Sequence, residues 1–234
     1  MEVHLYPAAG RPDPPTVIFF HDGIGLRPVM HEMAERLAAM GYLVAMPNMF
    51  YRAGDFPPFD PATAFTDPAE RARLWEIIRQ AAPASVMRDL GLLLEALADQ
   101  PGARVDRVGC VGYCLGGRMA FTAAGAYPDR VAAAASIHGG SIATDEPDSP
   151  HRQADRIRGR LYFAVADNDR TCTPESQELL AATLKEAGVA YELELYSGAA
   201  HGFAVPDLAT YDQAAAERHW QRLESLFAET LPGA

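Results

Sequence analysis

Short apolar runs alternate along the chain with longer stretches of helical periodicity. Several of the runs are apolar at every position, which is typical of strands that are covered on both faces in a parallel sheet. Seven strands are expected, at residues 3–7, 16–22, 43–50, 107–113, 131–140, 161–167 and 191–198. Helical patterns lie between them, at residues 28–40, 68–80, 84–99, 115–126, 174–187 and 210–230. This alternation predicts an α/β fold, a doubly wound and mostly parallel sheet with helices on both faces.

Glycine and proline mark the boundaries of these elements. Gly41 directly follows one helical pattern, as glycine commonly does where a helix ends. Thr173 before Pro174 predicts an N-cap followed by proline at the first helical position. Residues 52–68 have no periodic pattern and predict one long irregular insertion, either a functional lid or a plain surface excursion.

Composition and charge fit one soluble domain. With 234 residues, 49% hydrophobic and 22% charged, chain 1–234 is expected to form a single α/β domain that carries the insertion. Its formal net charge of -11 opposes binding to a phosphate backbone, which needs a basic surface. The N-terminus lacks the basic start and apolar core of a secretory signal, and no apolar run approaches the ~20 residues that span a bilayer. A cytoplasmic protein with neither nucleic acid nor membrane as a partner is expected.

The cysteines and histidines show no metal-binding pattern. The 3 cysteines include no C-x-x-C pair, so neither a disulfide framework nor a zinc site is indicated, and free thiols suit a reducing compartment. Several histidines have no ligand spacing to carboxylates or to one another: His4, His31, His151 and His219. No G-x-G-x-x-G follows the first strand, so a dinucleotide site is disfavoured. No metal and no cofactor is expected.

One cysteine stands where an apolar strand gives way to a helix of small residues. In "GYCLGG", Cys114 occupies the central position of a G-x-nucleophile-x-G motif. Such a turn is tight and strained, so its flanking positions must be small, and it lifts the nucleophile above the carboxyl edge of the sheet. The next N–H, that of Leu115, points at a developing oxyanion, and the positive end of the helix favours thiolate. Cys114 is therefore the candidate nucleophile, with a packing role as the alternative. Cys110 and Cys172 have no comparable setting.

A histidine and two aspartates follow this cysteine in the chain order that a strand–nucleophile–helix hydrolase requires, with the acid before the histidine. His201 lies in the small-residue stretch "SGAAHGF", directly after the last expected strand. Asp167 and Asp169 both lie at the end of the strand expected at 161–167. Asp169 is favoured as the acid because it lies further into the following loop, and Asp167 is expected to be solvated or to form the turn.

Together these motifs resemble the dienelactone hydrolase family of α/β-hydrolases. The resemblance covers essentially the whole chain and is carried by "VIFFHDGIG", "GYCLGG", the "ADND" turn and "SGAAHGF". It implies an α/β-hydrolase fold with a triad formed by Cys114, His201 and Asp169. It also implies a carboxymethylenebutenolidase-like activity, which is hydrolysis of a lactone or carboxylic ester through a thioester intermediate, with no cofactor.

The first strand–helix turn departs from the family's pattern. The family typically has Gln-Glu-x-x-Gly there, and its glutamate helps to ionise the cysteine, whereas this chain has "HDGIG" at residues 21–25. The resemblance implies that Asp22 replaces the glutamate with a carboxylate one methylene shorter. The alternative is an ordinary turn aspartate. The resemblance also implies that the N–H groups of Gly23 and Leu115 complete the oxyanion hole.

The two arginines that hold the substrate carboxylate in dienelactone-cleaving members are only partly matched. One would fall in "AERARLW", where Arg71 or Arg73 is the candidate and a solvated helix face is the alternative. The other would lie a few residues after the histidine, where this chain has Val205. This departure bears on the dienelactone substrate more than on the hydrolase chemistry. Aromatic residues around the insertion either cap an apolar pocket or pack the loop: Phe50, Tyr51, Phe56, Phe59 and Trp75.

Two other functions compete with lactone hydrolysis. The missing second arginine favours a broad-specificity esterase or thioesterase on the same scaffold. A non-catalytic binding or thiol-redox protein would need a resolving cysteine, but Cys110 lies roughly 13 Å from Cys114 along an extended strand, too far for a disulfide. His138 is expected to line the pocket or to support the structure. The expected partner is a small-molecule ester or lactone, and the sequence leaves its identity and the oligomeric state open.

Overall fold

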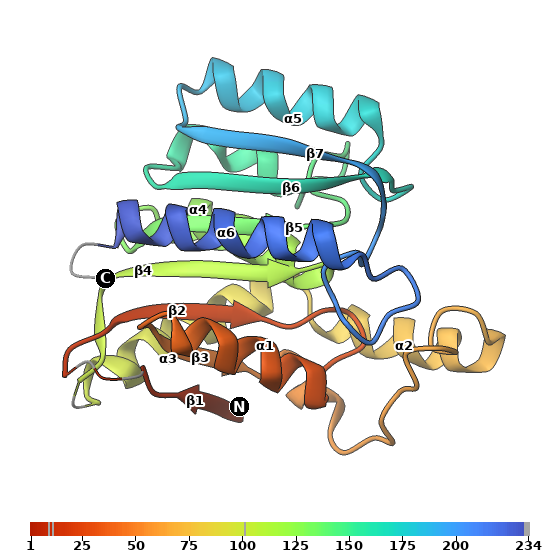
Figure 1. Cartoon of the computed structure of the whole chain (residues 1–234), viewed down its shortest axis with the longest axis horizontal. Helices are drawn as coiled ribbons and strands as arrows, with labels where there is room; N and C mark the ends of the chain where they lie inside the picture. The colour runs from red at the N-terminus through yellow and green to blue at the C-terminus, as the bar shows by residue number, and fades with distance from the viewer. Residues whose placement is uncertain (9, 11, 101, 232–234) are drawn as a thin grey trace.

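The computed structural model describes residues 1–8, 10, 12–100 and 102–231. Within this part of the chain, seven strands form one sheet: β1 (Val3–Tyr6), β2 (Pro15–Phe20), β3 (Leu43–Pro47), β4 (Arg104–Tyr113), β5 (Val131–Ile137), β6 (Arg160–Asn168) and β7 (Tyr191–Ala200). Their order in the sheet is β1-β3-β2-β4-β5-β6-β7. β1 runs antiparallel to β3, and the other neighbouring strands are parallel (Figure 1).

The connections between the strands are mostly helical. They are α1 (Pro28–Ala39), η1 (Tyr51–Ala53), α2 (Pro68–Gln80), α3 (Pro83–Ala98), α4 (Leu115–Ala126), η2 (Pro150–Arg156), α5 (Pro174–Glu186) and α6 (Gln213–Thr230). α1 and α6 cover one face of the sheet, and α3, α4 and α5 pack on the other (Figure 1). The predicted doubly wound α/β fold is therefore confirmed. None of the helices that the structure describes is both long and apolar enough to cross a membrane.

The burial of β2 explains why the strands appear in the sequence as continuous apolar runs. Val17 and Phe19 pack beneath α1 and α6, whereas Ile18 and Phe20 pack beneath α3 and α4, and all four are fully buried. Successive side chains of a strand point to opposite faces, so a strand covered on both faces needs apolar residues at every position. Each such side chain contributes about 1.5–3 kcal/mol through burial.

Four strands end earlier than the apolar pattern predicts: β1 by one residue, β2 by two, and β3 and β5 by three each. β3 ends at Pro47 rather than at residue 50, because the Met49 N–H donates to Nε2 of the buried His21 and not to a neighbouring strand. β5 ends at Ile137 rather than at residue 140, because His138 adopts a left-handed φ of 38° that breaks the extended backbone. The ends of β3 and β5 therefore turn into loops at the carboxyl edge of the sheet.

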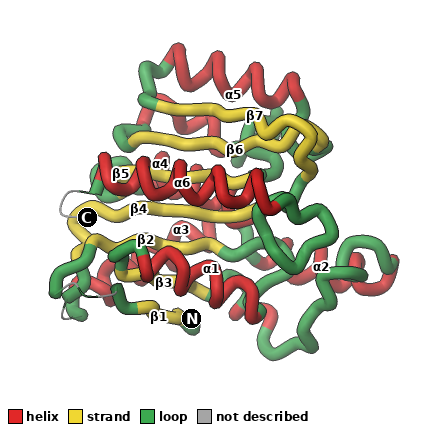
Figure 2. The backbone as a smooth tube through the Cα atoms, in the orientation of Figure 1, coloured by secondary structure: helices red, strands yellow, loops and turns green. Residues whose placement is uncertain are grey.

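Residues 52–68, expected to be an irregular insertion, lead into α2 beyond the carboxyl ends of the strands (Figure 2). The loop is anchored by its own apolar side chains, since Phe59 is 5% exposed and Ala64 is 0% exposed. Asp67 then caps α2, and its carboxylate accepts hydrogen bonds from two N–H groups of the first turn at 2.9 Å. Phe59 thus packs the loop against the body of the protein, whereas Trp75 is 48% exposed.

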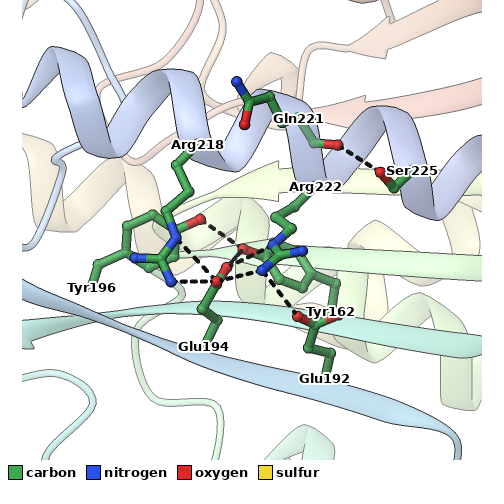
Figure 3. Close-up of polar contacts among 8 residues, drawn as sticks. All are labelled: Tyr162, Glu192, Glu194, Tyr196, Arg218, Gln221, Arg222 and Ser225. Carbon is green, nitrogen blue, oxygen red and sulfur yellow. Dashed lines mark hydrogen bonds and ion pairs between the residues drawn. The ribbon is translucent and has the colours of Figure 1, made fainter.

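A buried carboxylate on β7 connects the edge of the sheet to α6. Glu194 accepts hydrogen bonds from the guanidinium groups of Arg218 and Arg222 on α6 and from the Tyr162 hydroxyl on β6 (Figure 3). Burial by itself would raise the pKa of Glu194, but these donors lower it to about 2. The carboxylate is therefore ionised at neutral pH and holds β6, β7 and α6 together.

Glu194→Gln is expected to destabilise the fold by about 2 kcal/mol at neutral pH, because a charged acceptor of several hydrogen bonds becomes neutral. The folded-state pKa of about 2 lies below the ordinary value of 4.5. The stabilisation is thus present above the ordinary pKa and is lost as the pH falls toward the folded-state value. Urea unfolding at pH 7 and at pH 3 gives the free energy of unfolding of the wild type and of Glu194→Gln. The difference between the two proteins should be smaller at pH 3.

The matched control is Glu192→Gln. Glu192 lies 3.8 Å from Arg222, but its side chain is 43% exposed, so the loss of its charge should change stability little. Equal destabilisation by the two variants, at every pH, would contradict a special role for the buried carboxylate.

Candidate active site

Cys114 lies between β4 and α4 in a backbone conformation that side-chain-bearing residues rarely adopt, with φ 54° and ψ -115°. A Cβ on Gly112 would lie 2.0 Å from the carbonyl oxygen of Gly116, and a Cβ on Gly116 would lie 2.1 Å from that of Phe20. Neither distance is tolerable, so glycine at both positions lets the strand, turn and helix approach this closely. The "GYCLGG" motif is thus a strained strand–turn–helix junction that holds the cysteine at the carboxyl edge of the sheet.

The half-buried Cys114 also marks the N-terminus of α4. Its carbonyl oxygen accepts the first bonds of the helix, from the N–H groups of Gly117 at 3.0 Å and Arg118 at 3.3 Å. The N–H groups of Leu115 and Gly116 come before these in the first turn, where a helix has no internal acceptor to offer. Together with the helix dipole, they supply positive potential beside the sulfur.

The other two thiols have a different environment. Cys110 and Cys172 are buried and form no disulfide. Burial raises the pKa of both, that of Cys172 to about 12. Neither therefore supplies thiolate at neutral pH, which leaves Cys114 as the half-exposed thiol.

His201 and Asp169 meet at the carboxyl edge of the sheet, beyond β7 and β6. Nδ1 of His201 lies 2.7 Å from Oδ2 of Asp169. The other carboxylate oxygen of Asp169 accepts hydrogen bonds from the N–H and the hydroxyl of Thr171, at 2.7 and 2.6 Å. Burial would raise the pKa of Asp169, but the bonds from His201 and Thr171 lower it below its ordinary value. Asp169 is thus an ionised carboxylate that fixes the imidazole ring.

His201 is also electrostatically coupled to Cys114. Burial would lower the pKa of His201, yet the charge and hydrogen bond of Cys114 and those of Asp169 raise it well above its ordinary value. Because Nδ1 is engaged by Asp169, Nε2 is the ring nitrogen left for the thiol. The arrangement favours a protonated imidazole between the side chain of Cys114 and the carboxylate of Asp169.

The alternative acid, Asp167, lies elsewhere in the same turn. It is exposed, and its Oδ2 accepts a hydrogen bond from the Gly198 N–H at 3.0 Å. This contact joins the ends of β6 and β7. The structure therefore brings Asp169, and not Asp167, to the ring of His201.

Asp22 lies in the turn after β2, and its carboxylate is engaged on both oxygens. Oδ1 accepts from Nη1 of Arg27 at 2.7 Å and from the Ile24 N–H at 2.9 Å, and Oδ2 accepts from Nη2 of Arg27 at 2.8 Å. Arg27 also binds Asp207, six residues after His201. Neither Arg27 nor Asp207 was detectable from the sequence, because their pairing joins positions that are far apart in the chain.

The insertion and α2 cover the turn that contains Asp22. A Cβ on Gly23 would lie 3.3 Å from Cδ1 of Ile78 on α2 and 4.0 Å from the ring of Phe65 in the insertion. Gly25 has φ 94°, and a Cβ there would lie 3.2 Å from the ring of Phe50. The N–H of Gly23, which the family resemblance implies for the oxyanion hole, therefore belongs to a turn covered by apolar side chains.

The candidate arginines lie on α2, on different sides. Arg71 is exposed. Arg73 donates to the Pro57 carbonyl oxygen and to Glu70, both at 2.7 Å, and its guanidinium lies 3.8 Å from the centre of the Phe59 ring. Arg73 thus stabilises the insertion, and a role for Arg71 toward substrate stays a prediction.

His138 lies against the catalytic candidate. Its ring meets that of His201 edge-to-face, with centroids 5.2 Å apart, and it is 1% exposed. Burial lowers the pKa of His138 well below its ordinary value, so the ring is neutral. The sequence favoured a structural or pocket-lining role, and this position behind His201 is consistent with one. Its left-handed backbone was not detectable from the apolar pattern of β5.

In the described ranges, no three His, Cys, Asp or Glu side chains come together in a way that could hold a metal ion.

Comparison with known proteins gives consistent matches along the whole chain. The model of the dienelactone hydrolase family matches residues 2–231. A Synechocystis protein that carries the provisional name carboxymethylenebutenolidase is 27% identical over 220 residues, which span 93% of this chain and 87% of that protein. An Escherichia coli K12 protein with the same provisional name is 27% identical over 218 residues, 92% of this chain and 77% of its own length.

The solved structures agree with the fold. A provisionally named dienelactone hydrolase from Klebsiella pneumoniae superposes with a TM-score of 0.83 at 22% identity, and the match covers 97% of this chain and 92% of that one.

Proposed function

The chain belongs to the dienelactone hydrolase family and is a hydrolase, and we propose that it cleaves a lactone or carboxylic ester through nucleophilic attack by Cys114. The resemblance inferred from the sequence motifs is thereby confirmed at the level of the family. The proposal adds the role of each residue. The observation that carries it is the 2.7 Å contact between His201 and Asp169, next to a cysteine held in a strained strand–helix turn.

In the proposed first step, the thiolate of Cys114 attacks the carbonyl carbon of the ester, and the carbonyl oxygen becomes an oxyanion. The N–H groups of Leu115 and Gly23 stabilise that oxyanion, by roughly 3–4 kcal/mol for each donor. The carbon–oxygen bond to the alcohol then breaks, and protonated His201 gives its proton to the leaving oxygen. The product is a thioester on Cys114, and in a lactone the alcohol stays tethered to the acyl group.

In the second step, neutral His201 takes a proton from water, which attacks the thioester carbonyl. The carbon–sulfur bond breaks, the acid leaves, and the thiolate–imidazolium pair is restored. Asp169 keeps the imidazole in the tautomer that presents Nε2 to sulfur and water, and it stabilises the positive ring.

A broad-specificity esterase or thioesterase is the second candidate. Val205 is fully buried at the position where the family places an arginine, and the guanidinium of Arg73 is bound within the insertion. A substrate carboxylate would depend on Arg71 alone among the arginines that the sequence nominated. These observations favour uncharged esters over an anionic dienelactone.

The proposal is tested by assaying purified protein on a series of uncharged p-nitrophenyl esters and on an anionic dienelactone. We expect kcat/KM to be at least ten-fold higher for the best uncharged ester, and acid-quenched protein to carry an acyl group on Cys114 by peptide mass spectrometry. Arg71→Gln should raise KM for the dienelactone only. No hydrolysis of any substrate, or acylation at another residue, would contradict the proposal. A preference for the dienelactone would favour a dienelactone-cleaving hydrolase over a broad-specificity esterase or thioesterase.

A further inference from the structure

One arginine binds two carboxylates that come from opposite ends of the chain. Arg27 lies just before α1, Asp22 lies in the turn after β2, and Asp207 lies in the loop that follows His201. The side chains of Arg27 and Asp22 are 7% and 3% exposed, and that of Asp207 is 31% exposed. We call these three residues the Arg27 clamp.

The clamp uses every donor of the guanidinium group. Nη1 and Nη2 bind the two oxygens of Asp22 at 2.7 and 2.8 Å. Nε and Nη2 bind the two oxygens of Asp207 at 2.7 and 2.9 Å. Nη1 also donates to the carbonyl oxygen of Gly25 at 3.1 Å. A guanidinium has five N–H donors in a rigid plane, so these five bonds fix its orientation completely.

One end of the clamp sets the shape of the oxyanion turn. The carboxylate of Asp22 accepts a hydrogen bond from the Ile24 N–H at 2.9 Å. The backbone carbonyl oxygen of Asp22 accepts hydrogen bonds from the Gly25 N–H at 3.2 Å and from Nδ1–H of His21 at 2.8 Å. These bonds surround Gly23, whose N–H is assigned to the oxyanion. A change in the position of Asp22 would therefore turn that N–H away from the reacting carbonyl.

The other end of the clamp fixes the loop of the catalytic histidine. That loop is closed on itself, because the Thr210 hydroxyl donates to the His201 carbonyl oxygen at 2.8 Å and the Asp212 N–H donates to that of Phe203 at 3.0 Å. Asp207 lies within it. A displacement of Asp207 thus displaces the loop that positions the imidazole.

From these contacts we propose that Arg27 and Asp207 are positioning residues, which hold the Gly23 N–H and the His201 ring in register across the active site. Asp22 acts through the same clamp and not on the thiol of Cys114. The proposal rests on the function proposed above. A carboxylate bound by two guanidinium N–H groups and a backbone N–H would have to give up these bonds to approach sulfur. A substrate carboxylate would likewise have to displace Asp207 to reach Arg27.

The test compares Asp207→Asn and Arg27→Lys with the wild type on an uncharged p-nitrophenyl ester. Asparagine weakens one fork of the clamp, and lysine keeps the charge but cannot bind two carboxylates in forks. Because a misplacement of about 1 Å costs on the order of 10²-fold in rate, both variants should lower kcat at least ten-fold and change KM less than three-fold. Wild-type kcat in Asp207→Asn would overturn the clamp.

A second measurement separates positioning from activation of the thiol. Iodoacetamide alkylation of Cys114, followed against pH by peptide mass spectrometry, reports its thiolate directly. Asp22→Asn should leave this pH profile unchanged while lowering kcat. A profile shifted to higher pH in Asp22→Asn would show that Asp22 favours the thiolate, and would overturn this part of the proposal.

Glu217→Gln is the matched control. Glu217 on α6 also pairs in a fork with an arginine, Arg36 of α1, at 2.7 and 2.6 Å, but this pair is exposed. It should leave kcat near the wild-type value.

Amide hydrogen exchange tests the Arg27 clamp independently of ester hydrolysis. Peptides that cover residues 21–27 should exchange faster in Asp207→Asn, measured at equal temperature below both melting transitions, and not in Glu217→Gln. Faster exchange in a protein that hydrolyses no ester would keep the clamp as a structural device and refute the proposed function. Unchanged exchange together with unchanged kcat would refute the clamp alone.

Discussion

Cys114→Ala is expected to abolish ester hydrolysis, with kcat/KM lowered by roughly four to six orders of magnitude. The sulfur is the atom that bonds to the acyl carbon, and water in its place would have to attack without a covalent intermediate. Alanine keeps the Cβ, so the left-handed backbone, with φ 54°, is no more strained than in the wild type. The melting temperature should therefore stay close to that of the wild type.

Two further variants make this result specific. Cys114→Ser restores an oxygen nucleophile, but a hydroxyl is a much weaker acid than a thiol and must lose its proton to His201 as it attacks, in a site arranged around a cysteine. Serine should therefore recover little activity at neutral pH. Cys110→Ala removes a fully buried thiol on β4 and should keep kcat while it lowers the melting temperature by a few degrees. Substantial turnover by Cys114→Ala would exclude a thiol nucleophile.

Asp169→Asn should lower kcat by about 10³–10⁴-fold with a small change in stability. Asp169 accepts a hydrogen bond from Nδ1–H of His201 and stabilises the positive ring, so a neutral amide in its place neither fixes the tautomer of the imidazole nor supplies the negative charge. The pKa of His201 should fall as a result. Less imidazolium remains at neutral pH to stabilise the thiolate, and the alkylation profile of Cys114 should move to higher pH. Saturating-substrate kinetics and the alkylation profile measure both effects.

Asp167→Asn is the neighbouring control. Its carboxylate is exposed and accepts a hydrogen bond from the Gly198 N–H, and it does not meet His201. The variant should turn over within about three-fold of the wild type, with a stability loss of about 1 kcal/mol for one hydrogen bond. If Asp167→Asn loses activity and Asp169→Asn does not, the acid is assigned to the wrong aspartate. If neither substitution lowers kcat, the acid of the triad is a different residue.

The order and type of the helices and strands could be predicted from the amino-acid sequence. Strands buried on both faces must be apolar throughout, as in Val17–Phe20 of β2, and helices end at residues such as Gly41, with φ 98°. Both signals are local, because they depend on burial and on backbone conformation within a few residues. The start of β4 at Arg104 was not predicted from this pattern. Arg104 pairs with Pro15, but the strand is polar and exposed at 106 and 107, so the apolar run begins later.

The candidate triad was also accessible from the sequence, for a local reason. Each member lies just after a strand of one parallel sheet: Cys114 after β4, Asp169 after β6 and His201 after β7. Carboxyl ends of parallel strands meet at one edge, so position along the chain was enough to bring the three together.

Which charged and aromatic groups meet across the fold depends on tertiary packing. The chain has 20 basic and 31 acidic residues, and no local pattern selects Asp207 as the partner of Arg27 or Glu194 as the partner of Arg218. Those pairs form because packing of the sheet and helices brings distant segments into contact and excludes water from them. The same is true of His138, the left-handed residue directly after β5, whose ring meets that of His201. Pairing at a distance depends on the whole packed chain, whereas the elements and their ends depend on their immediate neighbours.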